Sequence, residues 1–555
     1  MNIGMDFGST YSILSRYSEK LKGPEAFEDQ VDNTVTIPTM VSVDDMGVEI
    51  GNTAKSMTGE IDVRTFKAFK MLLTDSDEKR LEKRHFDLKY SPKWATQEFI
   101  GNLVKRSQDF FGDNKIDHMV VGAPDVWFHQ FSTLSGRAVV HDICAEIDGV
   151  EKVTIVSEPV LASAYFAHNF KKKQGEPFDG SILIIDYGGG TLDLSLTKIN
   201  SISGSSAQIK MSGSNGAGEN SGDEIGNAGI VYMESLMAYA IRKENPEEAD
   251  DIIGSDDFLK AVNILEKYLI SKANDIKEAI ADDVLYPEDL ESRSLKFKIR
   301  CRNKAYIITM ADLVEVYNDV IRPVFDEKMD EMIEWADKKC GIDVFDKNSD
   351  KFKIELVGGF GNFHLVRQQM YEKFEISDDS SDELDNRRQS IINSVKDGER
   401  AISYGASLIA SGLFTICDTA PYSIGLLGNG VKEGNYMVHH MEEIDLHQPY
   451  FIQEYGEDKK FSCGGDWIDK FFIDYGMANP KEILFGPKPE FKKKLKAIIK
   501  NPFAEYAIGV SFDESEMMTL HLREYVYDLD KNDYVLSNQY KEELGELNTV
   551  FEEIK

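Results

Sequence analysis

The sequence predicts an α/β fold in which two lobes enclose a shared cleft, followed by a small β-rich region. Two observations predict the lobes: an apolar strand that ends in an aspartate, a glycine and hydroxyl residues occurs at residues 3–10, and it recurs in a longer form at residues 182–193. The β-rich region is predicted by residues 507–512 and 518–522, where apolar and polar side chains alternate as they do in hairpins.

The charge of the chain excludes one class of partner. Lys and Arg total 63 and Asp and Glu total 97, which gives a net charge of −34. A surface this acidic repels phosphate backbones and anionic lipid, so neither a nucleic acid nor a membrane surface is expected as a partner. A polyphosphate ligand would have to be held by backbone amides, a metal ion and a few lysines.

The targeting and redox features predict a cytoplasmic protein. A membrane-spanning helix needs about 20 apolar residues, and the longest candidate, residues 406–417, is interrupted by serines. No basic segment followed by an apolar run opens the sequence, so no secretory signal is expected. The 5 cysteines include no CxxC pair, which argues against structural zinc and a disulfide framework and fits a reducing compartment.

The first strand delivers a carboxylate to a tight polar turn. Asp6 lies between the apolar residues Met5 and Phe7 near the end of the alternation, which ends in Gly8-Ser9-Thr10. Such a turn can place amides and hydroxyls around a phosphate while the carboxylate faces a hydrated metal ion. An ordinary hairpin turn has the same composition, so this motif alone decides nothing.

The second strand repeats the arrangement with more glycine. Asp186 is followed by Gly188, Gly189, Gly190 and Thr191. The segment is no P-loop, because no Gly-Lys-Ser/Thr follows, and no dinucleotide fingerprint, because no helix opens at the glycines. Two such loops, about 180 residues apart in the sequence, would clamp a triphosphate from both sides if they faced each other.

Other segments complete the outline. Residues 356–360 form a strand that ends in a glycine pair, and residues 201–227 are a loop with a crossing strand. Helical spacing predicts helices at 256–281 and 398–412, and a basic helix near Phe491. We further expect an acidic loop at 376–385, an apolar connector at 413–418 and a short acidic helix at 539–555.

These motifs resemble the heat shock protein 70 family, within the wider superfamily of actin and sugar kinases. Five superfamily motifs occur in the family's order, and they cover about residues 1–414. They are phosphate loop one at 6–12, the first connecting helix at 158–165, phosphate loop two at 186–193, the adenosine loop at 358–359 and the second connecting helix at 400–407. The resemblance implies the two-lobed actin-like ATPase fold, each lobe with a five-stranded sheet.

The resemblance also implies roles for individual residues. Asp6 and Asp186 would hold a magnesium ion, largely through its waters. Lys70 has the position of the catalytic lysine, and Glu158 and Thr191 would help to position the attacking water, so the implied catalytic set is these three with Asp186. The implied nucleotide-binding residues are Gly8, Ser9, Thr10, Tyr11, Gly188, Gly189, Gly190, Thr191, Gly222, Asn274, Lys277, Glu278, Gly358, Gly359, Phe360, Asn362 and Glu399.

Two of these roles have plain structural alternatives. Lys70 could be a solvated helix lysine, because Lys67 lies about one turn away. Glu158, before Pro159, could be a carboxylate at a helix start. The implied cofactors are ATP or ADP and Mg²⁺, with K⁺ as a further candidate.

The base pocket departs from the family pattern. The purine-facing helix has Asn274, Lys277, Glu278 and Ala281 where the family has Glu, Lys, Arg and Ser, and Asn362 follows the adenosine glycines where the family has arginine. Two arginines that would sandwich the base are therefore missing, and we expect Phe360 to stack on it instead. Thr154 replaces an arginine of members that respond to J-domain proteins, so neither a J-domain co-chaperone nor an exchange factor is assigned.

The resemblance divides the chain into four parts, of which the last is too short for a full substrate domain with a helical lid. The parts are lobe I at 1–176 with an insertion at about 35–104, lobe II at 177–412 with an insertion at about 221–308, a linker at 413–418, and a β-rich substrate or partner domain at 419–555.

The implied function is an ATP-driven chaperone-like switch whose partner is a polypeptide client or a dedicated protein. One alternative is an actin-like filament-forming ATPase, although roughly 138 residues follow the second connecting helix and its connector. Another is a small-molecule kinase of the same superfamily, which would need a carboxylate base for an acceptor hydroxyl.

Overall fold

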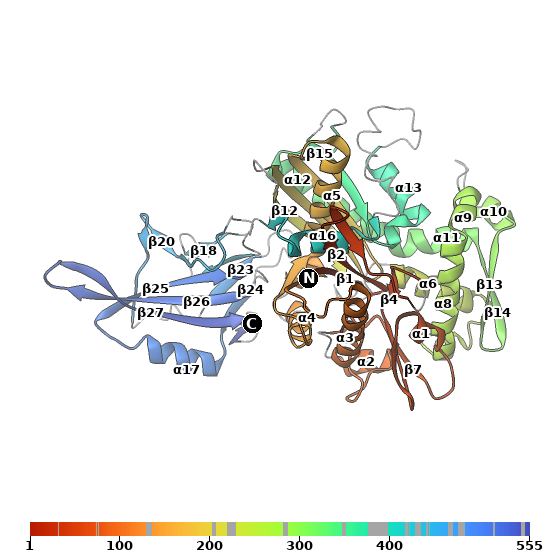
Figure 1. Cartoon of the computed structure of the whole chain (residues 1–555), viewed down its shortest axis with the longest axis horizontal. Coiled ribbons are helices and arrows are strands. Elements are labelled where there is room, and N and C mark those ends of the chain that lie inside the picture. The colour runs from red at the N-terminus through yellow and green to blue at the C-terminus, as the bar shows by residue number, and fades with distance from the viewer. Residues whose placement is uncertain are drawn as a thin grey trace.

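Figure 1 shows the computed structural model of the chain. The C-terminal strands lie at the left end of this view, and α8, α9, β13 and β14 lie at the right end. The structure describes residues 1–30, 33–73, 75, 77–128, 136–201, 207–218, 229–280, 287–346, 351–375, 398–416, 420, 422–427, 435–439, 442, 444–463, 470–474, 483–513, 517–545 and 550–554.

The first sheet is built around a central strand that is buried on both faces. Its order is β3-β2-β1-β8-β9, with β4 paired to β2, so it has six strands rather than the five expected. β1 runs antiparallel to β2 and parallel to β8. The strands are β1 (Asn2–Phe7), β2 (Tyr11–Ser18), β3 (Gly23–Ala26), β4 (Ile37–Pro38), β8 (His118–Ala123) and β9 (Val153–Ser157).

Helices cover both faces of this sheet. On one face, α3 (Pro92–Phe111) and α4 (Gly136–Ala145) share a core with β1 and β8. On the other, α16 (Ala401–Ala410), some 400 residues later in the chain, packs on β1 and on α5 (Glu158–Gln174). The close approach of α16 to β1 requires glycine at position 4, because a Cβ on Gly4 would lie 2.2 Å from the backbone nitrogen of Ser407. A helix was expected at 398–412, and α16 confirms it.

The second sheet repeats this pairing scheme. β10 runs antiparallel to β11 and parallel to β15, as β1 does with β2 and β8. Its order is β15-β10-β11-β12-β16. The strands are β10 (Gly180–Tyr187), β11 (Thr191–Ser201), β12 (Ala207–Gly218), β15 (Phe352–Val357) and β16 (Phe414–Ile416).

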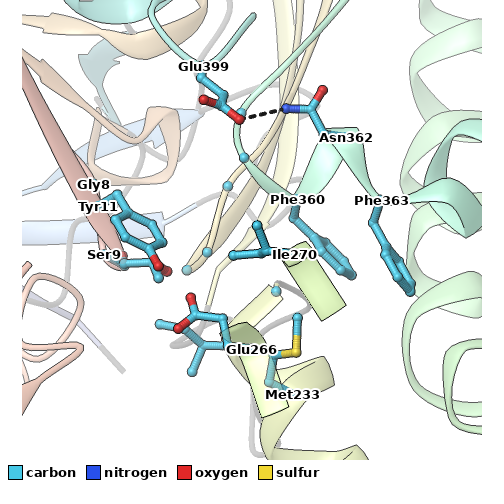
Figure 2. A pocket seen from close by; sticks show the side chains of 18 of the residues that line it. Gly8, Ser9, Tyr11, Met233, Glu266, Ile270, Phe360, Asn362, Phe363 and Glu399 are labelled. Atoms are coloured by element: carbon cyan, nitrogen blue, oxygen red, sulfur yellow. Dashed lines mark hydrogen bonds between the residues drawn. The ribbon is translucent and has the colours of Figure 1, made fainter. Parts of the chain in front are cut away.

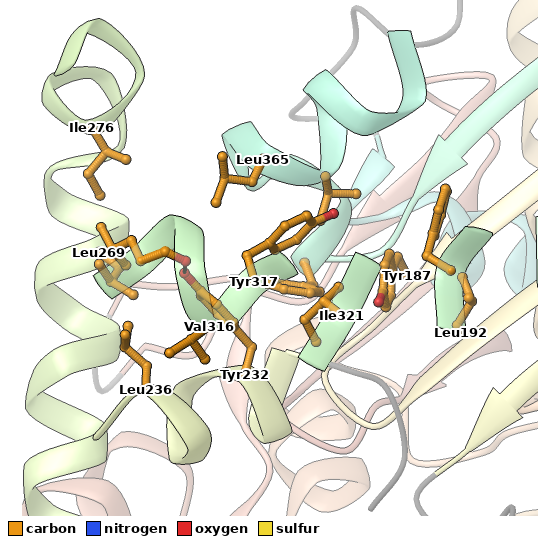
Figure 3. Close-up of a cluster of buried hydrophobic side chains, with 14 of the residues drawn as sticks. Tyr187, Leu192, Tyr232, Leu236, Leu269, Ile276, Val316, Tyr317, Ile321 and Leu365 are labelled. Atoms are coloured by element: carbon orange, nitrogen blue, oxygen red, sulfur yellow. Dashed lines mark hydrogen bonds between the residues drawn. The ribbon is translucent and has the colours of Figure 1, made fainter. Parts of the chain in front are cut away.

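The burial of β10 explains its continuous apolar run. Leu183 and Ile185 face one core, whereas Ile182 and Ile184 face another that includes α5. A strand buried on both faces reads as an unbroken hydrophobic stretch rather than an alternating one. Figure 3 shows the first of these cores, where Tyr187, Tyr232 and Tyr317 lie among aliphatic side chains.

A small unit is inserted within each of these two regions. The first is a three-stranded sheet of order β6-β5-β7 with two short helices, and the second combines several helices with the β13–β14 hairpin. The first contains β5 (Met40–Asp44), β6 (Gly47–Ile50), α1 (Gly51–Ser56), β7 (Arg64–Lys67) and α2 (Glu78–Lys83); the second contains α6 (Gly229–Glu244), α7 (Ala249–Ile252), α8 (Asp256–Ser271), α9 (Ala273–Ile280), α10 (Pro287–Ser292), β13 (Lys296–Cys301) and β14 (Lys304–Thr309).

Further helices support the second sheet and the turns beside it. The C-terminal end of β15 continues into a short 3-10 turn and then α13, and α12 precedes the strand. These elements are η1 (Asp125–Phe128), α11 (Met310–Val316), η2 (Tyr317–Ile321), α12 (Arg322–Cys340), η3 (Phe360–Asn362) and α13 (His364–Lys373).

Two further sheets share one apolar core beyond β16. Their orders are β18-β17-β23-β24-β28 and β19-β25-β26-β27, and α17 contributes Phe491 and Leu495 to the same core. The elements are β17 (Ser423–Leu426), β18 (Tyr436–Val438), β19 (Tyr450–Phe451), β20 (Gln453–Glu454), β21 (Glu457–Asp458), β22 (Phe461–Ser462), β23 (Phe471–Asp474), β24 (Ile483–Pro487), α17 (Pro489–Ile498), β25 (Ala504–Phe512), β26 (Met518–Asp528), β27 (Asp533–Gly545) and β28 (Phe551–Glu553).

One predicted element is wrong. Residues 539–555 were expected to form a helix, but they contribute to β27 and β28. Tyr540, Glu542 and Leu544 are more buried than their neighbours Lys541 and Glu543, so the segment has the period of two that a half-buried strand shows. The charged residues 541–543 obscure this alternation, so the composition of the segment suggested a helix.

Three other observations bear on the expectations. The apolar connector contains a strand, because β16 pairs in parallel with residues 207–209 of β12. The expected acidic loop at 376–385 lies outside the described residues. No helix in the described part of the chain is both long and apolar enough to span a bilayer.

Candidate functional site

A cavity of about 1230 Å³ lies where the ends of β1, β10 and β15 meet the helices of the second insertion. Residues from both sheets and both insertions line it, and Figure 2 shows ten of them by label. The cavity brings together both glycine loops, the Gly358–Gly359 turn, Lys70 and Glu158. Segments that are far apart in the sequence therefore contribute to one site.

The two loops that follow β1 and β10 lie directly against each other. A Cβ on Gly189 would lie 1.6 Å from Thr10 Oγ1, and a Cβ on Gly190 would lie 2.2 Å from Ser9 Oγ. Side chains cannot approach so closely, so only glycine allows this juxtaposition. The face-to-face arrangement expected of the loops is present.

The Gly358 turn closes against the same loops. Gly358 has φ +83°, and a Cβ there would lie 2.6 Å from Asp186 Oδ1. The position therefore needs glycine both for its left-handed backbone and for space.

Lys70 and Glu158 form a buried ion pair at the inner end of the cavity. Lys70 Nζ lies 2.6 Å from Glu158 Oε1, and the two side chains are 3% and 6% exposed. Lys70 follows β7 in a bend rather than a helix, so the alternative of a solvated helix lysine is wrong. Glu158 does begin α5, with Pro159 in its first turn, and its carboxylate nevertheless points at the lysine.

Carboxylates outnumber this single ammonium. Burial, and next Glu158, raise the pKa of Asp6 to about 8, while Lys70 opposes the shift. Burial and the neighbouring carboxylates, Glu158 foremost, raise the pKa of Asp186 well above its ordinary value. Burial raises the pKa of Asp193 to about 8, with Glu158 next. A cation bound here would offset the repulsion between these carboxylates and would stabilise their ionised forms.

Two buried polar atoms support the same conclusion. Asp186 Oδ2 and Thr10 Oγ1 are buried without a hydrogen-bond partner in the structure. Unsatisfied buried polar atoms are rare and call for an explanation such as an ion or water. Asp6, Asp186 and Asp193 thus have the chemistry to hold a divalent cation, since hard cations prefer carboxylate and water oxygens. Among the described residues, no three such side chains converge to chelate an ion directly.

Sequence reasoning did not single out Asp193, which acts on the charge of Asp186 although it does not itself line the cavity. It lies directly opposite Asp186 in the β10–β11 ladder and accepts a hydrogen bond from the backbone nitrogen of Asp125 at 2.9 Å. The signal was available, because a hairpin turn at 188–190 places these two aspartates across from each other.

The helix wall of the cavity begins earlier in the chain than expected. Asn274 and Lys277 line the cavity as predicted, but Glu278 does not. Glu266, Ile270 and Ala273 line it as well. The expected single helix is broken at Lys272, where α8 ends and α9 begins, so the α8 face carries much of the wall. Gly222 and Ala281 lie outside the described residues.

Phe360 is packed rather than available for stacking. Its side chain is only 7% exposed; its ring stacks on Phe363 at 5.7 Å and meets Tyr187 edge-on at 5.0 Å. The expectation that Phe360 stacks on a base is therefore wrong, because neighbouring rings already cover it. Figure 2 shows Phe360 and Phe363 side by side.

Two side chains at the rim form a polar edge. The Asn362 amide donates to Glu399 Oε1 at 3.2 Å, and both residues line the cavity. Thr154, in contrast, lies outside the lining and hydrogen-bonds His118 at 2.8 Å.

Two ion-pair groups join the two insertions, and Lys55, Lys67 and Glu266 of these groups also line the cavity. Lys55 Nζ, from α1, donates to Glu266 Oε2 of α8 at 2.7 Å and to the Tyr11 hydroxyl at 2.9 Å. Arg84 Nη1 donates to Glu234 Oε1 of α6 at 2.8 Å, and Lys67 Nζ lies 3.6 Å from the same oxygen. The sequence reading missed these ion pairs, because Lys55 and Glu266 are 211 residues apart and Arg84 and Glu234 are 150 residues apart.

The part of the chain that carries both glycine loops is similar to known proteins. Residues 2–235 match the family model described as Hsp70 protein. The chain is 25% identical over 235 residues to the "Chaperone protein DnaK" of Mycoplasmopsis agalactiae (strain NCTC 10123 / CIP 59.7 / PG2), a match that covers 42% of this chain. That match spans about a third, 35%, of the relative's own length. Over this N-terminal region, which is less than half of the chain, the sequence is therefore similar to the heat shock protein 70 family.

Proposed function

We propose that the cavity binds ATP together with Mg²⁺ and that the chain hydrolyses the terminal phosphate as part of a chaperone-like switch. The observation that carries the proposal is the contact between the two glycine loops beside the Lys70–Glu158 pair. Backbone amides and hydroxyls of these loops can surround a phosphate chain from both sides. The similarity of residues 2–235 to the Hsp70 family supports ATP as the ligand.

The proposed chemistry assigns each side chain one task. Asp6 and Asp186 would hold a Mg²⁺ ion, with Asp193 beside them. The ion would neutralise charge on the phosphate oxygens. Lys70 would place its ammonium on the terminal phosphate, and Glu158 would hold that ammonium in position. Thr191 and Glu158 would orient the attacking water. Phosphoryl transfer gains mainly from such alignment and charge stabilisation.

The division of the chain follows from the same proposal. The repeated strand-pairing scheme supports two lobes at 1–176 and 177–412, with the nucleotide between them. The linker at 413–418 would be the switched element, since β16 docks on the edge strand β12. The region 419–555 would engage a polypeptide client or a dedicated protein partner.

Calorimetry and turnover assays on the purified chain test the proposal. We expect Mg²⁺-dependent nucleotide binding and slow hydrolysis that follows the protein through gel filtration. Absence of binding to any nucleoside triphosphate would refute it. Sedimentation with ATP addresses the filament alternative, and a screen for phosphorylated small molecules addresses the kinase alternative.

A further inference from the structure

A short turn that follows the first sheet holds a carboxylate of the second sheet. The turn is η1 (Asp125–Phe128), which comes after β8 and lies beside β12. The backbone nitrogen of Asp125 donates to Asp193 Oδ1 at 2.9 Å, in a buried contact. Asp193 Oδ2 is buried without a hydrogen-bond partner in the described part of the chain. One oxygen of Asp193 is thus fixed by η1, and the other is left for an ion or a water.

The side chain of Asp125 is itself anchored. Ser157 Oγ donates to Asp125 Oδ1 at 2.9 Å, and the two residues are 5% and 3% exposed. Ser157 is the N-cap of α5, where a serine side chain usually accepts a hydrogen bond from the first turn of the helix. Here it makes no such bond. Because a missing cap costs helix stability, the hydroxyl that Ser157 directs at Asp125 points to a role beyond the start of α5.

The same turn also contacts the buried Lys70–Glu158 pair. Lys70 Nζ lies 5.6 Å from the centre of the Trp127 ring, over its face, and Trp127 is buried. The ring is tightly packed, since a Cβ on Gly136 would lie 2.4 Å from it. Ser157 directly precedes Glu158 in the chain. The η1 turn therefore joins the second sheet's aspartates to the ion pair of the first.

We propose that Asp125 is a positioning residue: anchored by Ser157, it holds Asp193 beside Asp186 and so sets how tightly the site binds its divalent cation. The proposal rests on the proposed function, because it needs a Mg²⁺-dependent nucleotide site. It adds a residue outside the cavity lining that controls the cation. Carboxylates at metal sites are oriented by hydrogen bonds from their neighbours, and loss of such a neighbour commonly lowers metal affinity about 10- to 100-fold.

Titration calorimetry of the full chain with ADP, once with Mg²⁺ and once with EDTA, tests the proposal. We expect Asp125→Ala to lower the ADP affinity about tenfold with Mg²⁺ and to leave it unchanged in EDTA. A general disturbance of the fold would instead lower both affinities alike. Asp125→Asn keeps an oxygen that can accept from Ser157, so it should recover most of the loss.

Ser157→Ala removes the same hydrogen bond from the α5 side, and it carries the test if Asp125→Ala does not fold. It should reproduce the Mg²⁺-specific loss. The double variant Asp125→Ala/Ser157→Ala should lose no more than either single variant, because residues that act through one shared contact are not additive.

Ser107→Ala is the matched control. Its hydroxyl is buried and donates to the backbone oxygen of Val104 at 2.7 Å, and Ser107 does not line the cavity. It should change neither affinity. Equal losses with and without Mg²⁺, or additive losses in the double variant, would overturn the proposal and leave the proposed function standing. A wild-type chain that binds no nucleotide would overturn both.

Discussion

The ammonium of Lys70 lies 2.6 Å from the carboxylate of Glu158, and both side chains are almost fully buried. The pair joins the first insertion to the start of α5 and faces the cavity. Because a buried ion pair leaves an uncompensated charge when one partner is removed, its substitution affects stability as well as chemistry. Any mutational test of catalysis here has to separate the two effects.

Lys70→Ala should lower turnover about 100-fold or more while nucleotide binding persists, because the lysine acts on charge that develops in the transition state. It should also destabilise the fold by about 3–5 kcal/mol, the usual cost of leaving one buried charge alone. Single-turnover hydrolysis and urea unfolding measure the two effects. In the control Lys70→Ala/Glu158→Gln, stability should recover in part and turnover should not. Full recovery of turnover would contradict the catalytic role.

Asp186→Ala should weaken Mg²⁺-dependent nucleotide binding, because it removes a carboxylate whose Oδ2 has no protein partner. Titration with and without Mg²⁺ measures the change, and the difference between the two conditions should shrink. Asp45→Ala is a suitable control, since Asp45 is an exposed turn residue outside the cavity lining. Retention of the full Mg²⁺ dependence by Asp186→Ala would argue against an ion at this carboxylate.

Glu234→Gln should speed nucleotide release about tenfold. The substitution keeps the shape of the side chain but weakens its contacts with Arg84 and Lys67, which join the two insertions. Stopped-flow displacement of a fluorescent nucleotide gives the release rate, which should also depend less on salt than in the wild type. Glu334→Gln, on the exposed face of α12, is the control. An unchanged release rate would show that these ion pairs do not limit opening.

Much of the cavity could be predicted from the sequence, and the errors have identifiable causes. The loops at 8–10 and 188–190 were found because glycine and hydroxyl residues follow apolar strands. The α8 wall was misplaced because the break at Lys272 leaves no strong local signal, such as proline or glycine. The stacking role of Phe360 failed because its burial depends on Phe363 and Tyr187, which sequence spacing does not bring together.

The C-terminal strands show the same limit. β25 and β26 were found from their alternation, whereas β27 was mistaken for a helix because its charged residues 541–543 interrupt the apolar pattern. Pairing with β26 makes this segment a strand. Its own composition does not indicate a strand, because sheet pairing is a contact between two segments rather than a property of one of them.

Asp458→Asn should remove part of the acid sensitivity of the C-terminal region. Burial alone would raise the pKa of Asp458, but hydrogen bonds from Tyr525 and Arg523 outweigh it and lower the pKa. A lowered folded-state pKa contributes stability above the ordinary value of 3.8, and this contribution is lost as the pH falls through the folded-state value. The stability difference between wild type and variant, measured by urea unfolding, should therefore narrow as the pH falls below about 4. A difference that is constant with pH would contradict this assignment.

Phe414→Asp/Ile416→Asp should release β16 from the edge of the second sheet. Both side chains are partly buried against the core that contains α5 and α16, and the backbone of the segment pairs with residues 207–209. Each carboxylate would have to be desolvated to remain there, which costs more than a strand of three residues can offset. Limited proteolysis should therefore cut the variant faster between α16 and β17 than the wild type. Thr415→Ser, at the exposed position between the two, is the control.

If docking of β16 is linked to the nucleotide, ATP should change the cleavage rate of the wild type and not of the double variant. An ATP effect of equal size in both would show that β16 is not the switched element.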